Sequence, residues 1–255
     1  MRWFARTEQL LGEEAYARLT RSRVAIYGLG GVGSFACEAL ARAGVGYLRL
    51  VDHDVVNPTN LNRQLLGLHS TLGQPKVEVA AARVKDINPA CEVDARRAFL
   101  NNDSVAELLL PEVDLVIDAI DSVNAKCALL QTAFEAGLPI VSSMGAGGRL
   151  DGGQILAGDL AKTRHCPLAT VIRQRLRRRG ISKGIHCIYS LEFSQNTLPP
   201  NPLDIDAHLG PGRARTPLGT ISYMPALFGL RVAQEAIGML LRVEPTEAEA
   251  EESLG

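Results

Sequence analysis

Short apolar runs alternate with helix-like stretches over the first 150 residues of the chain. Apolar runs at 23–28 and 47–52 have the length and composition of strands, and the stretches at 34–44 and 76–88 carry apolar residues at helical spacing. Alternation of this kind predicts a doubly wound α/β sheet with right-handed crossovers. Further strands are expected at 92–99, 113–120 and 138–148, and a further helix at 123–136.

The pattern is less regular after residue 150. A strand is expected at 151–160, a helix at 167–180, a long loop rich in Pro and Gly at 196–219, and a closing helix at 225–241. We therefore expect one domain over residues 1–243. Its sheet core spans about 20–150, a substrate-binding part spans about 151–243, and an acidic tail of disordered composition follows at 244–255.

Composition narrows the class of protein. The chain has 255 residues, of which 46% are hydrophobic and 22% charged, and its net charge is −1, so nothing predicts a global attraction to nucleic acid or to membranes. The N-terminus has no signal-peptide pattern. The most apolar stretch, 226–241, is interrupted by Arg231, Gln234 and Glu235, so we expect no membrane association. Five cysteines without a C-x-x-C pair favour reduced thiols, and we expect a cytoplasmic protein.

A glycine turn after the first predicted strand indicates a nucleotide site. Gly28, Gly30 and Gly33 match G-x-G-x-x-G, and Ser34 is placed to cap the helix that follows. Such a turn lets backbone approach a phosphate, and the helix N-terminus supplies free N–H groups. Asp52 ends the next strand, where an acid can accept a hydrogen bond from a ribose hydroxyl.

Charged residues near this turn favour ATP over NAD. A triphosphate with its metal calls for cations and a carboxylate, and the chain offers Arg63, Lys76, Asp118 and Asp121. Taken singly, each has an ordinary alternative: Arg63 could form a surface ion pair, and the two aspartates could cap the helix that follows. A nicotinamide oxidoreductase would leave Arg63, Lys76 and Asp121 without a role.

The same segments resemble the ubiquitin-activating-enzyme-like superfamily of ATP-dependent adenylyltransferases. The resemblance rests on "RTEQLLG", "GLGGVG", "LVDHDVVNPTNLNRQ", "GQPK", "INP" and "DAIDS". It implies the Rossmann-like sheet of that superfamily with an irregular C-terminal extension, and a homodimer in which Arg6 reaches the ATP of the neighbouring subunit. It also implies Mg²⁺ on Asp121, and catalytic roles for Arg6, Arg63, Lys76 and Asp121. The implied nucleotide contacts are Gly28, Gly30, Gly31, Gly33, Asp52, Asp54, Asn60, Arg63 and Lys76.

The second half narrows this resemblance. Sulfur-carrier activators of the superfamily usually hold zinc with two C-x-x-C pairs, which this chain lacks. Its segments "AGGRLDGGQILAGDLAKTRHCPL", "CIYSLE" and "GTISYMPALFGL" resemble the tRNA threonylcarbamoyladenosine dehydratases. That resemblance implies ATP-dependent cyclisation of a modified tRNA base through an adenylated carboxylate. The alternatives are a sulfur-carrier adenylyltransferase, with a possible sulfur-transfer partner protein, and a scaffold that has lost its chemistry.

A basic segment and one cysteine complete the candidates. Between Leu160 and Leu191 the chain has eight Lys or Arg residues and no Asp or Glu. This segment could contact tRNA phosphates or be an ordinary solvated helix face. Cys187 could be a nucleophile, as in related thioester-forming activators, or a buried thiol on a strand. The expected tRNA contacts are Arg173, Arg175, Arg177, Arg178, Arg179 and Lys183.

Overall fold

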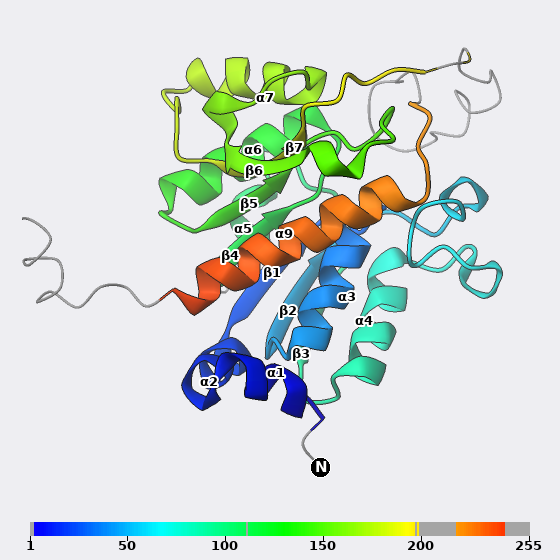
Figure 1. Ribbon diagram of the computed structural model, residues 1–255, viewed down its shortest axis with the longest axis vertical. Helices are drawn as coiled ribbons and strands as arrows, with labels where there is room; N and C mark the ends of the chain where they lie inside the picture. Colours follow the sequence, from blue (N-terminus) through cyan, green and yellow to red (C-terminus); the bar gives the residue numbers. More distant parts are fainter. Residues whose placement is uncertain (1–2, 111, 197, 199–217, 243–255) are drawn as a thin grey trace, which may run out of the picture.

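A seven-stranded sheet lies at the centre of the protein, with helices on both of its faces (Figure 1). The computed structural model describes residues 3–110, 112–196, 198 and 218–242. The strands are β1 (Arg23–Tyr27), β2 (Tyr47–Val51), β3 (Glu92–Arg96), β4 (Leu115–Asp118), β5 (Ile140–Ser143), β6 (Ile155–Asp159) and β7 (His186–Ser190). Their order is β3-β2-β1-β4-β5-β7-β6, and neighbours are parallel except β6 and β7.

Two groups of helices cover the two faces. One face packs against α3 (Gly33–Ala43), α4 (Lys76–Ile87) and α9 (Tyr223–Leu241). The other face packs against α5 (Val105–Leu108), α6 (Val123–Glu135) and α7 (Pro167–Arg177). Ahead of β1, α1 (Ala5–Leu11) and α2 (Glu13–Arg21) lie below the sheet in Figure 1. Single 3₁₀ turns are η1 (Pro58–Asn60), η2 (His69–Thr71), η3 (Gly152–Gln154) and η4 (Leu160–Lys162).

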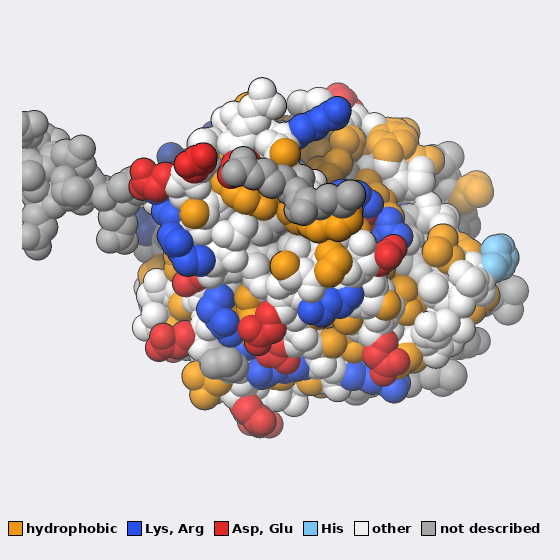
Figure 2. All heavy atoms as spheres, turned by 90° about the horizontal axis from the view of Figure 1, so that it is seen from below, with side chains coloured by type: hydrophobic (Ala, Val, Ile, Leu, Met, Phe, Trp, Pro, Cys, Tyr) orange, Lys and Arg blue, Asp and Glu red, His pale blue; other side chains and the backbone are white. Residues whose placement is uncertain are grey.

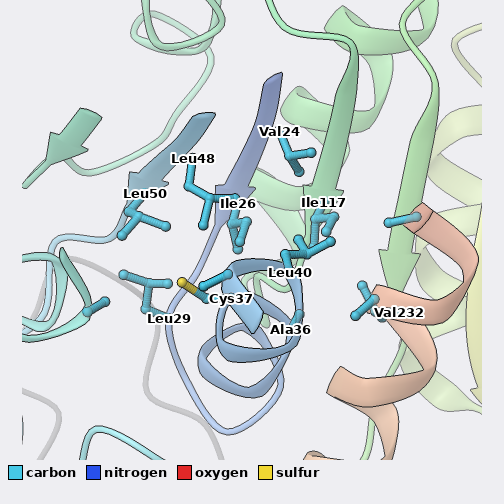
Figure 3. Close-up of a cluster of buried hydrophobic side chains, with 14 of the residues drawn as sticks. Val24, Ile26, Leu29, Ala36, Cys37, Leu40, Leu48, Leu50, Ile117 and Val232 are labelled. Atoms are coloured by element: carbon cyan, nitrogen blue, oxygen red, sulfur yellow. The ribbon is translucent and has the colours of Figure 1, made fainter. Parts of the chain in front are cut away.

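The apolar side of α3 fills the space between this helix and the sheet (Figure 3). Ala36, Cys37 and Leu40 are at most 3% exposed and lie against strand residues such as Ile26 and Ile117. Their spacing places them on one side of the helix. Burial of one Leu or Ile side chain contributes about 1.5–3 kcal/mol, so this packing fixes the start of α3 against the end of β1.

The closing helix α9 makes the closest helix contact with α3. A Cβ on Gly229 would lie 2.4 Å from the Val32 carbonyl oxygen, so a larger residue there would separate the two helices. By length and composition α9 is also, among the described helices, the one that could cross a membrane. In this structure Phe228 and Val232 are completely buried, and α9 serves as a core helix of the sheet.

The sheet brings three strand ends to one level. Tyr27 at the end of β1 is in register with Val51 of β2 on one side and with Asp118 of β4 on the other. The strand order reverses between β1 and β4, and open α/β sheets bind ligands at such a reversal, beyond the carboxyl ends of the strands. The residues that follow β1, β2 and β4 therefore lie along one edge.

The predicted α/β class is confirmed, and each strand and helix named above from the sequence is present. Several strands are shorter than predicted: β5 ends at Ser143 rather than at 148, and β6 begins at Ile155 rather than at 151. The structure adds α1 and α2, and it adds β7, which pairs with β5 and extends the same sheet into the second half of the chain. Most of the predicted loop at 196–219, and the acidic tail at 244–255, lie outside the described residues.

Candidate functional site

The turn after β1 requires glycine at its first and last positions. Gly28 has a φ of +89°, which other residues rarely adopt, and its N–H donates to the Val51 carbonyl at 2.8 Å. A Cβ on Gly33 would lie 1.8 Å from the Gly28 carbonyl oxygen. The helix N-cap residue, Val32, provides no side-chain hydrogen bond, so the N-terminus of α3 can receive an anion.

The middle of the turn packs against two distant segments. A Cβ on Gly31 would lie 2.8 Å from Pro225 Cβ and 3.3 Å from the Arg63 carbonyl oxygen. Ser34 does not cap the helix as the sequence suggested: its hydroxyl lies inside α3 and donates to the Gly30 carbonyl at 2.6 Å. The turn is therefore held by its own backbone and by neighbouring segments.

Asp52 is fixed between the turn and the exit of β2. Its Oδ2 accepts the Leu29 N–H at 2.6 Å, and its Oδ1 accepts the Asp54 N–H at 2.8 Å. The residue is 8% exposed. A carboxylate oxygen has more than one acceptor position, so this side chain can accept ribose hydroxyls without losing either backbone bond. The predicted ribose contact fits this geometry.

Lys76 places a buried cation at the same edge. It begins α4, is 4% exposed, and its Nζ donates to Asp54 Oδ2 at 2.8 Å. Asp54 Oδ1 also lies 3.2 Å from His53 Nε2. Asp52, His53 and Asp54 could geometrically share a metal ion, but the carboxylate of Asp54 already binds Lys76 and that of Asp52 binds two N–H groups. This group suits an anion held by Lys76 better than a metal ion.

Residues 57–64, here named the clamp turn, carry Asn60 and Arg63. Asn60 is buried, and its Oδ1 accepts the Asn57 N–H at 3.0 Å. Arg63 Nη1 donates to the Thr59 carbonyl at 2.7 Å. Burial lowers the pKa of the Arg63 guanidinium, and the negative charge of Asp121 acts against that shift. Asp121 is therefore near enough to Arg63 to act on its charge, and their roles at a triphosphate stay a prediction.

Behind Asp121 lies a buried ion pair that the sequence did not reveal. Asp118 and Lys126 are completely buried, and their Oδ2 and Nζ atoms lie 2.7 Å apart. The Ser142 hydroxyl donates to the same carboxylate oxygen at 2.6 Å, and Lys126 Nζ also donates to the Ile120 carbonyl at 2.9 Å. Asp118 is therefore no metal candidate, and the pair instead fixes the turn that carries Asp121. The sequence signal for this buried pair is Lys126 itself, a lysine inside the apolar helix stretch "NAKCALL".

Three of the six predicted tRNA contacts donate hydrogen bonds within the protein, and two of these three, Arg173 and Arg175, are only partly exposed. Arg173 Nη1 donates to Thr163 Oγ1 at 2.6 Å and to its carbonyl at 3.0 Å, which ties α7 to η4. Arg175 Nη1 donates to the Asn124 side chain. These contacts correct the sequence-based expectation for both arginines, because their guanidinium groups hold α7 against its neighbours.

The end of α7 keeps an exposed basic surface. Arg177, Arg178, Arg179 and Lys183 are exposed, although Arg179 also donates to Gln131 Oε1 at 2.7 Å. This concentration of positive charge is local. Figure 2 shows the lower end of the molecule, where Lys and Arg side chains are interspersed with Asp and Glu.

The structure argues against a nucleophilic Cys187. This residue lies on β7 with no exposed surface, and burial raises the pKa of its thiol to about 12. A thiol of this kind is neutral and out of reach of a substrate. The nucleophile hypothesis is therefore corrected in favour of a buried strand thiol.

Arg6 lies apart from the other candidates. It is exposed on α1, below the sheet, whereas the glycine turn lies at the start of α3 beyond the carboxyl end of β1 (Figure 1). The structure does not bring Arg6 together with the site of its own chain. A role at the nucleotide would need a neighbouring subunit.

Comparisons with known proteins point to one family along the whole chain. The model of the ThiF family matches residues 4–253. The tRNA threonylcarbamoyladenosine dehydratase of Bacillus subtilis is 39% identical over 248 residues, which cover 94% of each chain. That of Escherichia coli is 42% identical over 196 residues, covering 74% of this chain and 73% of the other. A solved structure of E. coli tRNA N6-threonylcarbamoyladenosine dehydratase in complex with ATP is similar with a TM-score of 0.82, 36% identity and 93% of both chains covered.

Proposed function

Because the chain belongs to the ThiF family, and within it to the tRNA threonylcarbamoyladenosine dehydratases, we propose that it uses ATP to dehydrate threonylcarbamoyladenosine in tRNA. One observation about the positions of the site residues supports the proposal. The glycine turn, Asp52, the clamp turn, Lys76 and the turn bearing Asp121 all lie along the carboxyl edge of the sheet. We propose a cytoplasmic location, because ATP and tRNA are both available there.

Dehydration requires that a poor leaving group, a carboxylate oxygen, become a good one. The threonyl carboxylate of the substrate attacks the α-phosphorus of ATP, and pyrophosphate leaves. A nitrogen or the carbonyl oxygen of the carbamoyl group then attacks the activated carbonyl carbon and expels AMP, which carries away the former carboxylate oxygen. In either case the proton that is lost comes from a carbamoyl N–H. Because the attacking group belongs to the substrate, no enzyme nucleophile is required, in agreement with the burial of Cys187.

The residues of the edge have separate tasks in the first step. Asp52 orients the ribose, and the N-terminus of α3 faces the phosphates. Lys76 and Arg63 stabilise the charge that accumulates as pyrophosphate leaves, which is commonly the largest contribution to such a step. Asn60 fixes the clamp turn that carries Arg63.

Asp121 suits a magnesium ion. It is an exposed carboxylate beyond the end of β4, and Mg²⁺ is commonly held by one or two carboxylates together with phosphate oxygens. The buried pair of Asp118 and Lys126 fixes the backbone before it. When bound, Mg²⁺ would neutralise phosphate charge.

A homodimer would explain both Arg6 and an exposed apolar surface. Leu150, Tyr223 and Leu227 are 63%, 44% and 39% exposed, and they form one surface: the Tyr223 hydroxyl donates to the Leu150 carbonyl at 2.9 Å. Contiguous exposed apolar side chains mark interaction surfaces. In the proposed dimer Arg6 reaches the phosphates of the neighbouring subunit.

The basic surface of Arg177, Arg178, Arg179 and Lys183 supports the tRNA substrate. Exposed cations at the end of one helix can bind phosphates of an RNA stem and position it without reading its sequence. These residues belong to α7 and the segment after it, which connects to β7 of the same sheet.

The experiment measures AMP and pyrophosphate release with and without tRNA bearing threonylcarbamoyladenosine. We expect release to require the modified tRNA, the nucleoside to lose one water, and the apparent affinity for tRNA to fall as salt rises. We expect Arg63→Ala to lower turnover about a hundredfold. Its circular dichroism spectrum should show that the fold is intact. Release that ignores tRNA and requires a small carrier protein would support the sulfur-carrier alternative instead.

A further inference from the structure

Two exposed rings lie against each other beside the second half of the sheet. The centroids of His165 and Phe193 lie 4.1 Å apart, with the ring planes tilted by 52°. Both residues are exposed, and Phe193 is 68% exposed although it is one of the largest apolar side chains. The pair therefore offers exposed aromatic surface to solvent.

The backbone around the rings is held rigidly. His165 has a φ of +57°, the left-handed region that non-glycine residues seldom adopt. The buried Arg149, 3% exposed, donates from Nη2 to the His165 carbonyl at 3.4 Å and from Nε to the Glu192 carbonyl, next to Phe193, at 3.1 Å. One buried guanidinium thus ties together the two backbone segments that carry the rings.

The ring pair is also connected to the nucleotide edge. The Gln195 N–H donates to the Gly148 carbonyl at 3.0 Å, and the Gly148 N–H donates to the Gly219 carbonyl at 2.7 Å. Asn62 of the clamp turn donates to the Thr220 carbonyl at 3.0 Å. Hydrogen bonds therefore lead from the segment after β7 to the clamp turn, the last of them through the Asn62 side chain.

We infer that His165 and Phe193 form a stacking platform for a nucleobase next to the modified adenosine of the substrate tRNA. This inference rests on the proposed function. Proteins recognise RNA sequence in single-stranded loops, where unstacked bases lie on aromatic side chains. The charge nearby is complementary to RNA, because Lys162 and Arg164 are exposed immediately before His165. A base on the rings would hold the loop of the tRNA against the edge at which its neighbour is adenylated.

A fluorescent variant detects the stacked base directly. The chain has one tryptophan, Trp3, so Trp3→Phe combined with Phe193→Trp gives a protein with one tryptophan at the platform. We expect modified tRNA to quench its emission saturably, with the Kd found by anisotropy. The control is Trp3→Phe alone, which has no tryptophan and gives the background change in emission.

Affinity measurements then test the contribution of the platform. Stacking of a base on an aromatic ring contributes enough binding free energy that we expect Phe193→Leu to weaken tRNA binding about tenfold or more. The matched control is Phe134→Leu on α6, the same substitution at a partly exposed position away from the rings, which should leave affinity unchanged. Both variants should bind ATP as the parent chain does.

The outcomes separate this inference from the proposed function. Suppose that wild-type turnover depends on modified tRNA, but that Phe193→Leu leaves tRNA affinity unchanged and Phe193→Trp shows no quenching. The platform is then refuted, and the proposed function stands. A change of oligomeric state in Phe193→Leu without a change in tRNA affinity would identify the rings as a protein contact and also overturn the platform. Absence of tRNA-dependent turnover in the wild type overturns the proposed function itself.

Discussion

Replacing Lys126 by methionine removes a positive charge from a completely buried place. Lys126 Nζ lies 2.7 Å from Asp118 Oδ2, and neither side chain has any exposed surface. Methionine keeps nearly the same length and volume, so the substitution mainly removes the charge and the hydrogen bond to the Ile120 carbonyl. Asp118 then remains buried as an unpaired anion.

The size of the effect follows from what remains around Asp118. Removing one partner of a buried ion pair costs about 3–5 kcal/mol, because the other charge stays out of water. Two donors remain after the substitution, the Ser142 hydroxyl at 2.6 Å and the Ile120 N–H at 3.1 Å. We therefore expect Lys126→Met to lower the free energy of unfolding by about 3 kcal/mol, the lower end of that range. Turnover should also fall, because the turn carrying Asp121 loses a tether.

Urea unfolding followed by circular dichroism measures this free energy. Lys162→Met, at an exposed lysine, is the control and should change it by less than about 0.5 kcal/mol. Asp118→Asn completes a double-mutant cycle, in which the double variant should be more stable than the sum of the single losses predicts. A loss below about 1 kcal/mol for Lys126→Met, with additive effects in the cycle, would refute the assignment of a stabilising buried pair.

Two further predictions concern titrating groups. Burial raises the pKa of the Cys187 thiol to about 12, so the thiol is neutral and takes no part in the reaction. Cys187→Ala should therefore release AMP at the wild-type rate. A folded but inactive variant would contradict the assignment of Cys187 as a buried strand thiol. Burial raises the pKa of Asp94, but hydrogen bonds from Arg96, Arg49 and Tyr47 outweigh it and hold the pKa at about 2. This carboxylate therefore stabilises the fold above its ordinary pKa of 3.8, and the contribution is lost as pH falls towards 2. Asp94→Asn should flatten the fall of Tm over that acidic range, and parallel Tm curves for the two proteins would contradict the pairing.

The sequence was sufficient for the parts of the fold that depend on local pattern. The apolar runs around β1 and β2, the glycine turn and the helical spacing of α3 predicted a doubly wound sheet, and the structure has it. Gly28 and Gly33 were recognisable because only glycine fits a turn with positive φ and such close backbone contact. The candidates Asp52, Lys76 and Arg63 were found because each follows a recognisable element.

The remaining features depend on contacts between distant segments. Lys126 and Asp118 could not be paired from sequence, because their contact depends on how α6 packs against β4. The sequence places Arg173 in a basic segment, but its hydrogen bond to Thr163 depends on how α7 packs against η4. Arg149 carried no local signal, since its partners are carbonyl groups brought together by the chain fold. Charge counted along the sequence does not distinguish a cation that faces solvent from one that holds two elements together.

The contact between Gly31 and Pro225 has a consequence for synthesis of the protein. The nucleotide-binding turn joins β1 to α3, which leave the ribosome early, directly after α1 and α2. The helix that packs against this turn, α9, is the last of the described elements. Until α9 emerges, the side of α3 that packs against Phe228, Gly229 and Val232 of α9 is open to solvent. Nascent chains with a nearly complete sheet therefore still lack a finished nucleotide site. Translation to the end of α9 sets the moment at which the enzyme can first hold its substrate.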